Sequence, residues 1–142
     1  MQEQNYSNHK RFHPIYHYVI LPLAIAGLVG SVINLTKASS ENLYSASLLL
    51  VAFILLFLIG ALVRLYSLKV QNRLIRTEEN FRHYTLTGKT LSHDLRMGQI
   101  IALRFASDEE FPSLAARAVN EKMKPAEIKK SIKNWRADFY RI

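Results

Sequence analysis

Two long stretches of the chain contain no charged residue. Neither Phe12 to Thr36 nor Asn42 to Val63 includes a Lys, Arg, Asp or Glu. A helix needs about 20 predominantly apolar residues to cross the hydrocarbon core of a bilayer, and a small soluble core has no use for two such runs. The pattern therefore predicts two transmembrane helices, at about 15–35 and 43–63, joined by a short polar turn.

A cleavable signal peptide is the alternative for the first apolar stretch, with Lys10 and Arg11 as its charged region. The apolar run is longer than the core of an ordinary signal peptide, and residues 37–40 make a poor cleavage site. We therefore expect the first stretch to be a retained membrane span.

The second helix is expected to extend well beyond its apolar stretch. After Val63 the apolar residues continue at helical spacing, and no Gly or Pro occurs before Gly88. We expect one helix from about residue 43 to about residue 82. Two series in this region share heptad positions: Val63, Val70, Thr77 and Tyr84 in one, and Ser67, Leu74 and Phe81 in the other. They are too short and too polar to predict a coiled coil by themselves.

The remaining residues predict a small helical domain. Apolar spacing indicates a short helix from about Met97 to Phe105, and a second helix after Ser107-Asp108-Glu109-Glu110, which has the sequence of a capping box. A last helix is expected after Pro125, because the following apolar residues fall at i, i+4, i+7 and i+11. The expected core of the domain consists of Phe105, Phe111, Leu114, Ile128, Ile132, Trp135 and Phe139.

Together these elements predict an all-α membrane protein. We expect a two-helix transmembrane hairpin whose second helix extends into the cytoplasm and is followed by a small helical domain. The expected parts are an N-terminal cytoplasmic tail (1–14), the hairpin (15–63), a juxtamembrane helix (64–87) and a cytoplasmic domain (88–142).

The basic residues predict the orientation of the hairpin. The chain has 19 Lys and Arg against 11 Asp and Glu. Basic residues flank both outer ends of the hairpin, whereas the turn between the spans holds only Lys37. The positive-inside rule then places both termini in the cytoplasm.

Positive charge is also concentrated near the C-terminus, in a cluster of Lys129, Lys130, Lys133 and Arg136. Such a cluster beside a membrane is attracted to anionic lipid headgroups, faces a partner, or is simply a solvated surface. Nucleic acid is a disfavoured partner, because the chain has no recognisable motif of a nucleic-acid-binding fold.

Small residues make the first span a candidate packing site. Ala26 and Gly30, and Gly27 and Ser31, form two overlapping pairs four residues apart, which allow another backbone to approach closely. We expect these faces to pack on the second helix of the same chain, with an oligomer interface as the alternative.

Few side chains have the potential for chemistry. His9, His13 and His17 are spaced by four, but Pro14 interrupts the stretch, so no metal site is expected. The motif of His9, Arg11, Pro14 and His17 is instead typical of a membrane interface. The chain has no cysteine, no phosphate-binding loop and no nucleophile beside a base at a recognisable spacing. We therefore expect no catalytic residue, no metal and no cofactor.

Two parts of the sequence contain specific motifs. One is residues 4–11 followed by Pro14 and His17; the other is residues 99–110, together with residues 128–130 and 134–139. In these parts the chain resembles an uncharacterised family of small two-span bacterial inner-membrane proteins, a domain of unknown function sometimes labelled ABC transporter permease. The resemblance covers nearly the whole chain and implies two spans and a cytoplasmic helical tail. It implies no activity and assigns no catalytic residue.

The leading hypothesis is a non-enzymatic, membrane-anchored adaptor that presents a basic helical domain to a partner. The alternative is a homo-oligomeric pore or an accessory subunit of a membrane transporter, in which the small residues of the first span join the subunits. Both hypotheses require the lipid bilayer, and both allow a homo-oligomer or a larger membrane-protein complex.

Overall fold

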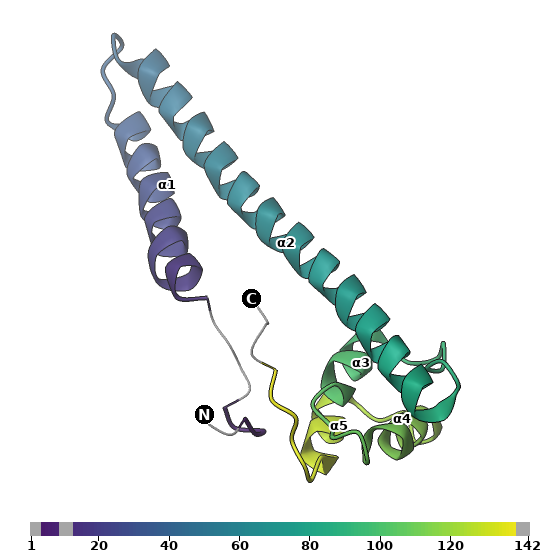
Figure 1. Cartoon of the computed structure of the whole chain (residues 1–142). Coiled ribbons are helices and arrows are strands. Elements are labelled where there is room, and N and C mark those ends of the chain that lie inside the picture. The colour runs from purple at the N-terminus through teal and green to yellow at the C-terminus, as the bar shows by residue number, and fades with distance from the viewer. Residues whose placement is uncertain (1–3, 9–12, 139–142) are drawn as a thin grey trace. The chain divides into compact units, whose positions relative to one another are not determined.

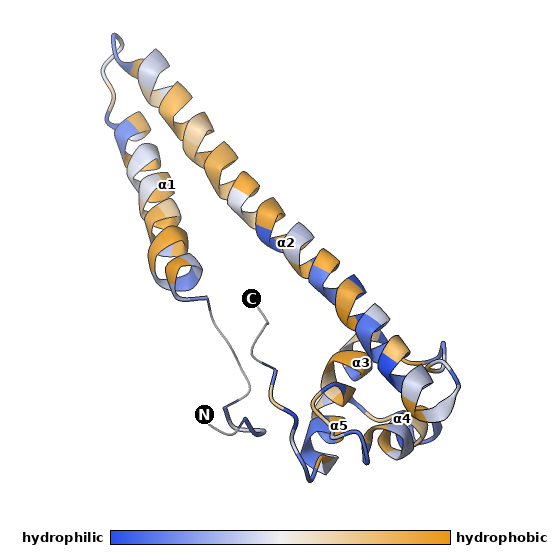
Figure 2. Cartoon of the chain, in the orientation of Figure 1, coloured by the Kyte–Doolittle hydropathy of each residue, from blue (hydrophilic) through white to orange (hydrophobic). Residues whose placement is uncertain are grey.

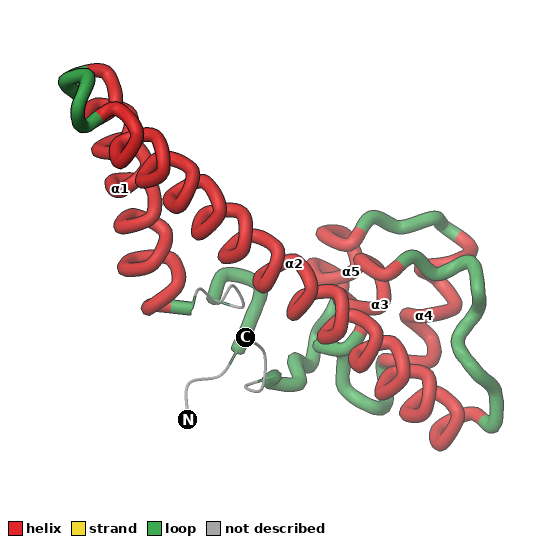
Figure 3. Tube along the Cα trace, turned by 90° about the horizontal axis from the view of Figure 1, so that it is seen from above, coloured by secondary structure: helices red, strands yellow, loops and turns green. Residues whose placement is uncertain are grey.

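A computed structural model describes residues 4–8 and 13–138 of the chain (Figure 1). The described residues divide into two compact units, one formed by residues 13–68 and the other by residues 4–8 together with 69–138. Every regular element of the described residues is a helix (Figure 3). The prediction of an all-α fold is therefore confirmed for this part of the chain.

The first unit contains the π-helix η1 (Tyr16–Ile20), α1 (Leu21–Thr36) and the first part of α2 (Leu43–Thr87). At the junction of η1 and α1 the N–H of Leu21 donates to the carbonyl of Tyr16, five residues back. Pro22 follows immediately and has no N–H to donate to Tyr18, which interrupts the regular α-helical pattern. The π turn therefore coincides with the proline.

Both helices of the first unit are long and apolar enough to cross a membrane (Figure 2). Among its described residues only Ser31 and Ala46 are buried. Large apolar side chains are instead exposed, for example Leu23 at 66% and Leu56 at 61%. This unit therefore has no hydrophobic core of the kind that holds a soluble domain together.

The second unit packs three short helices against the C-terminal part of α2 (Figure 1). They are α3 (Met97–Leu103), α4 (Phe111–Asn120) and α5 (Pro125–Ser131). Gly88 ends α2 in the left-handed conformation, with a φ of 71°, and donates its N–H to the carbonyl of Tyr84. A glycine adopts this conformation without steric cost, which explains why the helix ends here. α2 therefore ends five residues later than residue 82, the end that the pattern of apolar residues had indicated.

The core of the second unit is formed around side chains with 0% exposure, including Phe105, Phe111 and Ile128. Leu114 and Ile132 are also buried, and Trp135 packs against the core while partly buried. Phe139, the last of the expected core residues, lies outside the described residues.

The prediction of a last helix that includes Trp135 is wrong. α5 ends at Ser131, and Ile132 already has an extended backbone, with φ −71° and ψ 124°. The next residues pair with the segment after α3, in an isolated antiparallel bridge between Trp135 and Ala106. Backbone pairing therefore buries the apolar side chains that had indicated a helix.

The predicted capping box is also wrong. α4 begins at Phe111, whose N–H donates at 2.9 Å to the carbonyl of Ser107, and no side chain caps the helix. The carboxylate of Glu110 instead accepts the N–H groups of Lys133 and Asn134, at 3.1 and 2.9 Å. The acidic residues before α4 thus make tertiary contacts in place of a helix cap.

Candidate functional site

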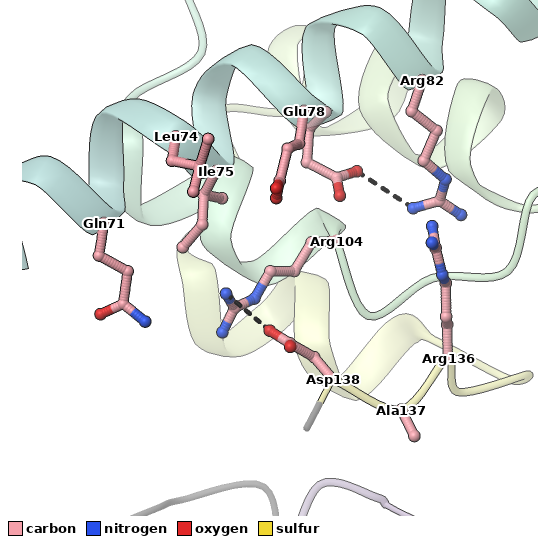
Figure 4. Close-up of a pocket in the computed structure, with 10 residues that line it drawn as sticks. Gln71, Leu74, Ile75, Glu78, Arg82, Arg104, Arg136, Ala137 and Asp138 are labelled. Atoms are coloured by element: carbon pink, nitrogen blue, oxygen red, sulfur yellow. Dashed lines mark hydrogen bonds and ion pairs between the residues drawn. The ribbon is translucent and has the colours of Figure 1, made fainter. Parts of the chain in front are cut away.

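A cleft of about 480 Å³ opens in the second unit between α2 and the segment after α5 (Figure 4). We call it the arginine cleft. Its lining consists of Gln71, Leu74, Ile75, Glu78, Glu79, Arg82, Arg104, Arg136, Ala137 and Asp138. The lining brings together three arginines and three carboxylates, so the cleft contains charges of both signs with little net charge.

Arg82 ties α2 to the segment before α4. Its guanidinium donates to the carboxylates of Glu79 and Asp108, at 3.1 and 2.7 Å. It also donates to the carbonyl of Ala106 at 2.7 Å. The same group lies 4.4 Å from the centre of the Phe111 ring, at cation–π distance. The planar fork of donors on an arginine suits such a branched set of contacts.

Glu79 is a buried carboxylate one turn before Arg82, with an exposure of 7%. Burial raises the pKa of Glu79, because the charged form loses its hydration. The positive charges of Arg82, Arg136 and Arg104 lower the pKa and offset the effect of burial only in part. The floor of the cleft therefore holds a carboxylate that is costly to ionise.

The other wall of the cleft is closed by Arg104 and Asp138, whose charged groups lie 2.9 Å apart. The backbone N–H of Asp138 donates at 2.8 Å to the side-chain oxygen of Gln4, which is only 8% exposed. Nearby, the Lys130 ammonium lies 5.7 Å from the centre of the Tyr6 ring. The two ends of the chain thus contact each other in this unit, which no pattern in the sequence had indicated.

The rim of the cleft is open. Glu78 and Arg136 are exposed, and Arg136 reaches toward Arg82 in Figure 4. Leu74 adds an apolar side chain that is 57% exposed. The lining contains no Ser, Cys or His, and the buried carboxylate of Glu79 accepts a hydrogen bond from Arg82 at 3.1 Å. The rim therefore exposes a carboxylate, a guanidinium and an apolar side chain together.

The sequence profile of a family of unknown function (DUF6526) matches residues 1–142. The chain belongs to this family. The expectation of an uncharacterised family is thereby confirmed. The description of DUF6526 names neither a membrane location nor a permease, so these implications of the resemblance stay predictions. No curated protein and no solved structure is detectably similar to the chain.

The basic cluster of this DUF6526 member is not one face of a helix. Lys129 and Lys130 lie on α5, whereas Lys133 and Arg136 follow it. The ammonium of Lys129 lies 5.6 Å from the centre of the Phe105 ring, and Arg136 lines the arginine cleft. Lys130 and Lys133 are exposed. The cluster is thus divided between the surface and the cleft.

The two pairs of small residues on α1 face different environments. Gly27 packs against the ring of Phe53 on α2, so closely that a Cβ atom would collide with it. Ser31 is 2% exposed and donates to the carbonyl of Leu28 at 2.7 Å. Ala26 and Gly30 are exposed, and a Cβ atom at Gly30 would meet nothing within 4 Å. One pair therefore serves packing within the chain, and the other is left on the surface.

Two members of the N-terminal interfacial motif, His9 and Arg11, lie outside the described residues. Pro14 is in the first helical turn, and a ring nitrogen of His17 lies 3.0 Å from the carbonyl oxygen of His13. No group of three His, Cys, Asp or Glu side chains in the described ranges is placed to hold a metal ion.

Proposed function

We propose that this chain is a membrane-anchored adaptor of the bacterial inner membrane, without enzymatic activity. In this proposal α1 and the first part of α2 cross the bilayer as a hairpin. The second unit is then held at the cytoplasmic surface, where its open rim binds a partner protein.

The observation that carries the proposal is the exposure of apolar side chains in the first unit. Its first candidate span has 21 residues, which at about 1.5 Å per residue gives about 32 Å. The hydrocarbon core of a bilayer is about 30 Å thick. Lipid tails would cover side chains such as Leu23 and Leu56, which the unit itself leaves exposed. Charged residues are absent from both spans, as a lipid environment requires.

The contact between Asp138 and Gln4 supports the proposed orientation. Two segments that form a hydrogen bond must lie on the same side of a membrane, and two crossings return the chain to the side from which it started. Basic residues such as Lys69 and Arg73 follow the second span, and the positive-inside rule assigns that side to the cytoplasm.

The arginine cleft supports an adaptor in preference to an enzyme. The charged groups on its floor are hydrogen-bonded or ion-paired with each other, and the lining residues include no Ser, Cys or His that could act as a nucleophile or relay. At the rim, Glu78, Arg136 and Leu74 offer a carboxylate, a guanidinium and an apolar contact to a partner segment. Interfaces of this mixed kind are common between proteins that associate reversibly.

Membrane insertion is tested by extracting membranes with alkaline carbonate, which removes peripheral proteins. The natural chain should stay in the membrane pellet. Leu55→Arg places a charge in the middle of the second span and should cost about 2.5–3.5 kcal/mol of insertion free energy, which lowers the pelleted fraction. Leu86→Arg is the matched control, because Leu86 is an exposed leucine on the same helix but in the second unit. Equal behaviour of the two variants would contradict the proposal.

Attraction of the basic cluster to anionic lipid is the second part of the proposal. Trp135 is the single tryptophan of the chain and lies in the second unit, so its fluorescence reports on that unit alone. In liposomes with spin-labelled headgroups, quenching of Trp135 should be stronger with anionic than with neutral lipid, and salt should reverse it. A triple variant in which Gln replaces Lys129, Lys130 and Lys133 should show weaker quenching. Equal quenching by both lipids would remove this part of the proposal.

The alternative function, a homo-oligomeric pore or an accessory subunit of a transporter, is favoured by the exposed pair of small residues on α1. Ala26 and Gly30 leave a shallow surface on which another helix could pack closely. The mass of the purified protein in detergent distinguishes the two. A closed ring of several copies, lost in Gly30→Val, would favour the alternative over the adaptor.

A further inference from the structure

We infer that two copies of the chain associate in parallel through one face of α2 in the second unit. We call this face, formed by Val70, Leu74, Thr77, Phe81 and Tyr84, the dimer face. The inference goes beyond the proposed adaptor function, because it names a second copy of the chain as the occupant of this face. The face shares Leu74 with the lining of the arginine cleft, and the rest of it lies outside that lining.

The dimer face is apolar and uncovered. Its four large side chains are exposed by 54–69%: Val70 67%, Leu74 57%, Phe81 69% and Tyr84 54%. At 3.6 residues per turn the five residues fall within an arc of about 80°. Their spacing alternates between three and four residues, which is the a and d pattern of a two-stranded coiled coil. The a and d side chains are thus exposed and could pack against a partner helix.

The opposite face of α2 is already occupied. Ile75 and Glu79 are both 7% exposed and point into the second unit. Asn80, at the edge of that face, accepts the N–H of Leu91 at 3.1 Å. Contacts within the unit therefore account for the buried face of α2, and they leave the apolar side chains of the dimer face exposed.

The charges beside the dimer face favour a second copy of the same chain. With the apolar residues at positions a and d, Arg73 takes position g and Glu78 takes position e, and both side chains are exposed. In a parallel coiled coil, position g of one helix lies beside position e of the other, five residues further on. Arg73 of each copy would then lie beside Glu78 of the other, so two-fold symmetry gives two pairs of opposite charge.

An antiparallel pair lacks this complementarity, because it brings position g beside g and position e beside e. Membrane anchorage adds to the preference for the parallel pair. Two hairpins inserted in the same orientation present α2 in the same direction, and this step rests on the proposed function. The charge pattern favours the same arrangement independently.

Single cysteines test the contact in native membranes, because the chain has no cysteine of its own. Thr77→Cys and Tyr84→Cys place thiols at position d, and mild oxidation should convert most of each variant to a disulfide-linked dimer. Leu86→Cys is the matched control. Leu86 is 42% exposed and lies on the same helix, about 160° around it from the centre of the dimer face, so it should stay monomeric.

Charge exchange tests the pairing in the Thr77→Cys background. Arg73→Glu or Glu78→Arg alone brings like charges together and should lower the cross-linked fraction about threefold or more. The double variant should restore it. Residues five apart do not face each other on one helix, so the rescue must arise between two copies.

Equal cross-linking of Leu86→Cys, a cross-link to a protein of another mass, or no rescue by the double variant would each overturn the inference. Failure of membrane insertion would appear separately, in the carbonate extraction.

Discussion

Removal of the Phe111 ring should destabilise the second unit strongly. The ring is completely buried at the start of α4. It meets the His83 ring edge-on at 5.7 Å and lies beneath the guanidinium of Arg82. Phe111→Ala should cost about 3–5 kcal/mol, the usual cost of deleting a buried phenyl ring. A domain of about 70 residues has a total stability of about 4–10 kcal/mol, so the loss would be a large part of it.

Phe111→Leu is the matched control for this prediction. Leucine keeps most of the buried apolar volume but loses the contacts with His83 and Arg82, which should cost about 1–2 kcal/mol. Urea unfolding of the full chain in detergent, followed by the fluorescence of Trp135, measures both variants. The midpoint should fall from the natural protein to Phe111→Leu and further to Phe111→Ala. An unchanged midpoint for Phe111→Ala would refute the packing of α4 on α2.

Three further predictions follow from single side chains. Because burial raises the pKa of Glu79, its ionisation opposes folding increasingly as the pH rises from 4.5 through the raised pKa. The free energy of unfolding of the Glu79→Gln variant minus that of the natural protein should therefore increase with pH across that window. A difference that does not change with pH would contradict the burial of Glu79. Glu110→Ala removes the acceptor of two backbone N–H groups and should cost about 1–2 kcal/mol in urea unfolding, with about half that loss for Glu110→Gln. Gly27→Val should lower the temperature of aggregation in detergent, because the new side chain collides with Phe53. Gly30→Val should leave that temperature unchanged, because a Cβ atom at Gly30 meets nothing within 4 Å.

The sequence predicted the long elements well, because their physical cause is local. The absence of Gly and Pro between Val63 and Gly88 predicted that α2 continues beyond its apolar stretch, and Gly88 ends the helix because it adopts the left-handed conformation. Apolar spacing identified side chains that the core of the second unit contains, such as Phe105 and Ile128. Whether the two apolar helices enter a membrane stays a prediction.

The errors arose where tertiary contacts replaced local ones. Ile132 and Trp135 have helical spacing, yet the chain is extended there, because its backbone pairs with residues 105–107. Glu110 resembles part of a helix cap, yet its carboxylate binds backbone groups more than 20 residues away. Local propensity is a weak guide wherever such long-range partners exist.

The arginine cleft could not be predicted, because its charged groups come from distant parts of the chain. Arg82, Arg104 and Arg136 lie on α2, after α3 and after α5 respectively, and no motif connects them. The contact of Gln4 with Asp138 is longer-ranged still. The dimer face could be predicted only in part. Its heptad spacing was visible in the sequence, but the exposure of its side chains was not.

Labelling of single cysteines in whole cells tests the central claim most directly, namely that a membrane hairpin holds the second unit in the cytoplasm. Ser40→Cys lies in the turn between the two apolar helices, and His93→Cys lies on the surface of the second unit. A thiol reagent that cannot cross the inner membrane should label Ser40→Cys in intact cells and should label His93→Cys only after the membrane is permeabilised. Labelling of His93→Cys in intact cells, or equal protection of both positions, would contradict the account.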